Sequence, residues 1–138
     1  MTVATNRLLE RVEAGGETLA VIVRADYSPT VTEFVTGPDV VQQLGFVVYP
    51  AGSEIPRHDH RALERTIEGT PECLLVRKGR AEVTLYDRRR REVCRRVLEC
   101  GDVILLAGGG HGFRQLEDTV FMEIKQGPYA GVADKESF

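Results

Sequence analysis

The sequence predicts an all-β protein built as one domain. Many short segments rich in branched and aromatic residues are separated by Gly and Pro turns, a pattern typical of a sandwich or barrel. The chain has 138 residues, of which 42% are hydrophobic and 28% charged, so it is long enough for a two-layer core and ordinary for a soluble globular domain.

The predicted elements follow this pattern along the chain. Residues 5–13 are amphipathic, with Leu8, Leu9 and Val12 at helical spacing before Gly15-Gly16, and predict a short N-terminal helix or arm. The remaining chain predicts strands, which lie at 18–24, 30–36, 44–49, 54–60, 72–77, 81–87, 92–98, 103–106, 112–116 and 119–125. The segment from residue 126 onward is expected to be irregular.

Composition and charge argue against several classes of partner. A net charge of -3 gives no general electrostatic reason to bind nucleic acid or an anionic membrane. The four arginines 88–91 are flanked by Asp87 and Glu92 and have no interleaved aromatic for base stacking, so we interpret them as a solvated turn. The apolar runs are too short for a spanning helix, and the N-terminal stretch has no secretory apolar core, which predicts a cytoplasmic protein.

Cysteine usage agrees with a reducing compartment. The three cysteines, Cys73, Cys94 and Cys100, are odd in number and form no C-x-x-C pair. We therefore expect free thiols.

Residues 52–79 carry the most informative pattern. His58 and His60 are one residue apart, so in an extended strand both point to the same face. A carboxylate follows at Glu64 or Glu72. Imidazole and carboxylate together suit a divalent transition metal. The third and last histidine, His111, follows an apolar run that ends in a glycine turn.

These residues resemble two motifs of the cupin superfamily. Gly52, five residues, His58-x-His60, then a Glu and Gly79 resembles the first motif, and Gly101 followed by residues 107–111 resembles the second. The resemblance covers about residues 44–125. It implies an antiparallel jelly-roll β-barrel. It also implies one divalent metal held by His58, His60, a Glu and His111, with iron ahead of manganese, nickel, zinc or copper.

The sequence departs from the family pattern at several positions. Glu72 comes late after His60 but is followed by six residues and then Gly79, and it opens a good strand, so we favour it over Glu64 as the ligand. Residues 61–71 then form a lengthened loop at the barrel mouth. In the second motif Ala107 replaces the usual proline, and Gln115 stands where the family has asparagine.

The resemblance extends to function without selecting one reaction. It implies a metal-dependent enzyme acting on a small carboxylate- or sugar-like molecule, a dioxygenase first and an isomerase second. The alternative is a metal-containing binding or regulatory module without turnover. The catalytic candidates are Tyr49, Arg57 and Gln115. Further cations that could bind an anionic substrate near the mouth are Arg65, Arg114 and Lys125.

Strand parity also bears on assembly. Cys73 and Leu75 point away from the face of Glu72, and residues 103–106 are apolar at every position, which implies cover on both faces. Residues 5–13 could provide that cover from their own chain or from a partner. We predict a two-fold homodimer whose metal sites are apart and independent.

Overall fold

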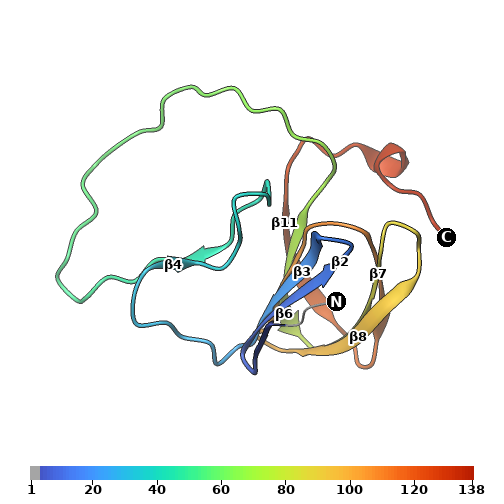
Figure 1. The fold of residues 1–138 in the computed structure, drawn as a ribbon. Coiled ribbons are helices and arrows are strands. Elements are labelled where there is room, and N and C mark those ends of the chain that lie inside the picture. The colour runs from blue at the N-terminus through green and yellow to red at the C-terminus, as the bar shows by residue number, and fades with distance from the viewer. Residues whose placement is uncertain (1–3) are drawn as a thin grey trace.

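The computed structural model describes residues 4–138, which fold almost entirely into antiparallel β-sheets (Figure 1). Three sheets have the orders β1-β2-β3-β9-β6-β11, β10-β7-β8 and β4-β5. The strands are β1 (Ala4–Asn6), β2 (Leu9–Ala14), β3 (Glu17–Val23), β4 (Glu33–Phe34), β5 (Gly45–Phe46), β6 (Glu72–Lys78), β7 (Arg80–Tyr86), β8 (Glu92–Glu99), β9 (Val103–Leu106), β10 (Gly110–Gln115) and β11 (Val120–Lys125). A 3-10 turn, η1, spans Gly131–Asp134. The all-β prediction is confirmed.

The predicted N-terminal helix is wrong, because its residues form strands. β2 pairs with β1 on one side and β3 on the other, and Val12 is fully buried between the sheets. Gly15 and Gly16 both have positive φ, at 61° and 76°. Two such residues make a tight hairpin turn, so the glycine pair connects two strands instead of ending a helix.

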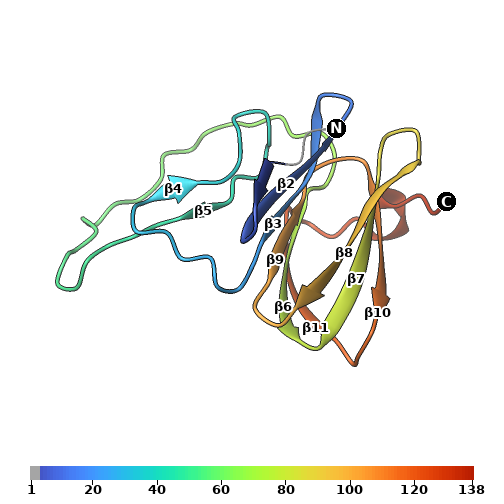
Figure 2. The same ribbon diagram turned by 60° about the horizontal axis from the view of Figure 1, so that its bottom comes forward.

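The main core lies between the six-stranded and three-stranded sheets (Figure 2). Its side chains come from alternate positions of both sheets, with β6 supplying Leu74 and Val76, and β7 supplying Val83 and Leu85. Strand alternation along β6 therefore places Glu72 on the inward face, as the sequence predicts.

A second apolar cluster covers the outer face of the six-stranded sheet. Cys73 and Leu105 are buried there with Val21, while segment 27–46 covers them with Val35 and Val40. The prediction that β9 is covered on both faces is confirmed, but most of the cover comes from residues 27–46 and not from residues 5–13.

Residues 49–69, which we call the arm, leave the sheets altogether. Every residue of the arm is exposed, and none belongs to a helix or strand. In Figures 1 and 2 the arm makes a wide arc from the β4–β5 pair, away from the sheets and back to the start of β6. The predicted strand at 54–60 is therefore wrong for this chain, and the strands predicted at 30–36 and 44–49 shorten to β4 and β5.

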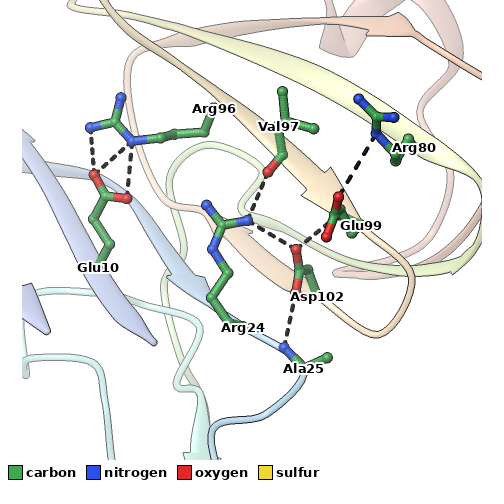
Figure 3. A network of polar contacts seen from close by, with 8 residues as sticks. All are labelled: Glu10, Arg24, Ala25, Arg80, Arg96, Val97, Glu99 and Asp102. Atoms are coloured by element: carbon green, nitrogen blue, oxygen red, sulfur yellow. Dashed lines mark hydrogen bonds and ion pairs between the residues drawn. The ribbon is translucent and has the colours of Figure 1, made fainter. Parts of the chain in front are cut away.

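A polar network centred on Asp102 joins the ends of β3, β8 and β9 (Figure 3). Asp102, only 4% exposed, accepts hydrogen bonds from the backbone nitrogens of Ala25 at 2.9 Å and Glu99 at 2.8 Å. It also accepts one from Arg24 at 2.9 Å, whose same nitrogen donates to the Val97 carbonyl at 2.7 Å. These bonds hold the ends of β3, β8 and β9 together.

Two simpler predictions can be compared with the same structure. All three cysteines are free thiols. Over residues 4–138, no helix is both long and apolar enough to cross a bilayer.

Candidate metal site

Two of the predicted ligands come together at one end of the sheets. Glu72 opens β6 in the six-stranded sheet, and His111 lies on β10 in the three-stranded sheet. His111 Nε2 and Glu72 Oε2 are 3.4 Å apart. The pair therefore bridges the two sheets where the core ends.

The neighbours of Glu72 favour its ionised form. The hydrogen bond with His111 lowers the pKa of Glu72 below its ordinary value, although burial of the carboxylate acts in the opposite direction. The charges of His111, Lys125 and Lys135 lower that pKa further. The Lys125 ammonium lies 3.9 Å from Glu72 and 3.6 Å from Glu123. Glu72 is thus a deprotonated carboxylate that lies between a histidine and a lysine and could serve as a metal ligand.

The separation of these donor atoms fits shared metal coordination. Histidine nitrogen and carboxylate oxygen each bind a transition metal at about 2.0–2.2 Å, so two ligands of one metal stand about 3.0–3.5 Å apart. The observed 3.4 Å lies in this range. Glu72 and His111 could therefore hold one ion between them without moving far.

A pocket of about 980 Å³ opens at the pair. Glu72 and His111 line it, together with the β7–β8 turn and residues 134–138. A smaller pocket of about 370 Å³ adjoins it, and His111 lines both. The site is large enough for a small organic molecule.

Residues 134–138 lie across the outer part of this pocket. Phe138 packs edge-on against Tyr86 with ring centroids 5.1 Å apart, and the Arg90 guanidinium lies 4.9 Å from the centre of the Phe138 ring. Arg90 also forms an ion pair with Glu136 at 3.0 Å. The pocket wall on this side therefore combines an aromatic pair with charged groups of both signs.

The other two predicted ligands lie elsewhere. His58 and His60 are exposed on the arm, with ring centroids 5.2 Å apart, and His58 Nδ1 lies 2.8 Å from the Pro56 carbonyl oxygen. Within residues 4–138 of a single copy, no three His, Cys, Asp or Glu side chains gather as a possible metal group. The four-ligand set thus stays a prediction, with one half assembled and the other half on the arm.

The remaining candidates separate in the same way. Tyr49, Arg57 and the rejected ligand Glu64 are exposed on the arm. Gln115 is exposed at the end of β10. Of the cations chosen from the sequence, Lys125 is the one that forms an ion pair with Glu72 in the described chain.

Sequence reasoning missed the wall made by Tyr86, Arg90 and Phe138. The arginines at the β7–β8 turn have the exposed, partly paired character expected of a solvated turn, but the turn also reaches the pocket. One signal was present in the glycine run. A Cβ at Gly109 would lie 2.2 Å from the Tyr86 carbonyl oxygen, so this run lets β10 pass close to the end of β7.

Comparison with known proteins does not place the chain. No protein-family model, no curated protein and no solved structure matches it.

Proposed function

We propose that the chain is a small metal-binding protein of the cupin type, with one divalent metal held by His58, His60, Glu72 and His111. The observation that carries the proposal is the approach of Glu72 to His111 at 3.4 Å, from different sheets, at the edge of a pocket. Glu72 and His111 come from the two separate motifs in the sequence. The two facing antiparallel sheets support, at a coarser level, the proposed jelly-roll barrel.

The surrounding charges indicate the class of ligand. Three cations line the pocket beside four acidic side chains, and Lys125 lies beside Glu72: the cations are Arg88, Arg90 and Lys135, and the acids are Glu72, Asp87, Asp134 and Glu136. A bound divalent metal would make the balance of these charges positive. Cations near a metal favour an anionic, carboxylate-bearing small molecule, or a sugar-like one that offers oxygen donors. The bound metal would supply Lewis-acid or redox chemistry, with iron first among the candidates. The chain's own residues would hold the ligand, and the aromatic wall would limit access of water.

Two classes of activity are consistent with this site. The first is an enzyme, a dioxygenase ahead of an isomerase. The second is a binding or regulatory module without turnover. One observation supports the second: Gln115, the catalytic candidate that lies outside the arm, does not line the pocket in the described chain.

Elemental analysis of protein purified without a histidine tag tests the metal site. We expect about one transition-metal ion per chain. Glu72→Gln should lower that content at least about tenfold, because the amide cannot neutralise the cation. Glu64→Gln is the matched control and should leave the content unchanged. An unchanged content in Glu72→Gln would contradict the assignment.

The two classes of activity need a separate measurement. Oxygen consumption by the iron-loaded protein, in the presence of a co-purified small molecule, would support the dioxygenase. Binding of that molecule without a product would support the module.

A further inference from the structure

We propose that the arm crosses to a second copy of this chain and lies along the free strand edges beside that copy's Glu72 and His111. Each site then takes His58 and His60 from one chain, and Glu72 and His111 from the other. The role of the histidines rests on the proposed function, whereas the exchange of the arm can be tested without a metal. This arrangement replaces the expectation of independent sites in a homodimer.

The arm contains the paired histidines but pairs with no strand of the described chain. His58 and His60 are one residue apart, so an extended segment would put both on one face, yet in the described chain the hydrogen bonds of the arm are local, such as Ser53 to Pro50 and His58 to Pro56. Its large apolar side chains, Tyr49, Ile55, Leu63 and Ile67, are exposed. Irregular segments of this length inside a folded domain are uncommon and are usually either functional or linker segments.

Two strands of the sheets have open edges with which the arm of another copy could pair. β10 and β11 are each at the end of a sheet, so the outer edge of each pairs with no strand among residues 4–138. The two edges adjoin, because Phe113 of β10 and Phe121 of β11 pack with ring centroids 5.1 Å apart. β11 also presents Met122 and Ile124 to solvent, at 48% and 54% exposure. An extended segment added at these edges would pair with their backbone, and the arm's exposed apolar side chains could pack beside Met122 and Ile124.

The same edges adjoin the half-assembled site. Lys125 on β11 is opposite Glu72 in the register, and His111 lies on β10 itself. A strand pairing with the outer edge of β10 would carry its side chains beside His111. Because His58 and His60 share one face of an extended strand, both would reach the site together.

The base of the arm directs it away from its own edges. The Val48 nitrogen donates to Thr32 Oγ1 at 2.9 Å, and the Val35 nitrogen donates to the Leu44 carbonyl at 2.9 Å. Phe46 is held against Tyr27 with ring centroids 5.2 Å apart. From this fixed base the arm extends away from the sheets, as both ribbon views show. A two-fold axis lets two copies each place their arm on the other, which is a domain swap.

The first experiment detects exchange without a metal. Unlabelled and 15N-labelled chains at equal concentrations are unfolded together in urea and refolded, and metal is removed with a chelator. The refolded protein is then treated with a carbodiimide, which joins carboxylates to amines. Light scattering should return twice the 15.3 kDa chain mass. In cross-links between arm carboxylates, such as Asp59, and Lys125, about half should join a labelled to an unlabelled chain. The ion pair of Lys125 with Glu72 within one copy is the internal control and should give unmixed products.

The second experiment asks whether the site is shared. One variant carries His58→Ala with His60→Ala, and the other carries Glu72→Gln with His111→Ala. Neither should bind metal alone, but a co-refolded equal mixture should recover about a quarter of the wild-type metal, because half of the dimers are mixed and each holds one intact site. A site built within one chain would recover none.

The outcomes separate the two proposals. A monomer mass, or only unmixed arm cross-links, overturns the exchange even if the wild-type protein holds metal. Mixed cross-links in a protein that binds no metal support the exchange and overturn the metal function, together with the shared site. If arm cross-links are mixed and the wild-type protein binds metal, but the mixture of the two variants recovers no metal, the exchange stands and only the shared site is overturned.

Discussion

Replacing Asp102 with alanine tests what holds the strand ends together. The carboxylate accepts three hydrogen bonds, two from backbone nitrogens and one from Arg24, and only 6% of its side chain is exposed. Asp102→Ala removes the acceptor of all three hydrogen bonds at once. It also leaves Arg24, whose side chain is 27% exposed, without its counter-ion.

The magnitude follows from those contacts. A hydrogen bond to a charged group contributes about 1.5–3 kcal/mol net, and bonds that share one carboxylate are not additive. Removing one partner of a fully buried ion pair costs about 3–5 kcal/mol, but Arg24 keeps its bond to the Val97 carbonyl and has some access to water. We therefore expect Asp102→Ala to lower the free energy of unfolding by about 3 kcal/mol. Asp102→Asn keeps one acceptor oxygen and should cost less.

Urea unfolding followed by circular dichroism measures this change. The protein concentration must be the same for every variant, because self-association would shift the midpoint. Glu117→Gln is a suitable control, since its ion pair with Arg80 spans 3.6 Å at the surface and is worth less than about 1 kcal/mol. If Asp102→Ala costs less than about 1 kcal/mol, the network does not hold these strand ends, and the reasoning is wrong.

Two further predictions concern other parts of the sheets. Gly79→Ala should lower the free energy of unfolding in urea by about 3 kcal/mol, because φ is 86° and a Cβ would lie 2.2 Å from a backbone oxygen. Gly69→Ala is the control: φ is 80° but the space is open, so the loss should be about 1 kcal/mol. Equal losses would show that the close contact relaxes freely. Burial raises the pKa of the Cys73 and Cys94 thiols above the ordinary thiol value, so at pH 8 less thiolate forms there. A thiol-disulfide reagent should therefore modify exposed Cys100 first, and the two others should react faster as the pH rises; equal rates for all three in the folded protein would contradict this burial.

The strands from β6 to β11 could be predicted because each is specified locally. The alternation of residues 72–77 matches β6, residues 103–106 match β9, and turn glycines such as Gly79 and Gly101 have the positive φ that requires glycine. The N-terminal error has an equally local cause. Leu9 and Val12 fit helical spacing, but Val12 is also a buried strand position, and pairing with β3 decided between them.

Half of the candidate site could be predicted for the same reason. Glu72 opens a strand and has the motif's spacing to Gly79, and strand parity predicts its inward face. Its partnership with His111 follows from the resemblance to the two cupin motifs, and the two side chains lie 3.4 Å apart in the structure. The pocket wall could not be predicted. Phe138 and Arg90 are far apart in the sequence, and neither has a periodicity that indicates a contact.

The arm differs from both cases, because its local pattern and its structure disagree. A strand pattern specifies which side chains share a face, but it does not specify which edge the strand pairs with, and that edge can belong to another chain. The spacing of His58 and His60 indicates a shared face, while β10 and β11 have edges that pair with no strand of the described chain. When such a segment and an open edge do not meet within one chain, a second copy can supply the missing pairing without any change in the sequence. The oligomeric state must therefore be measured before a chemical role is assigned to His58 and His60.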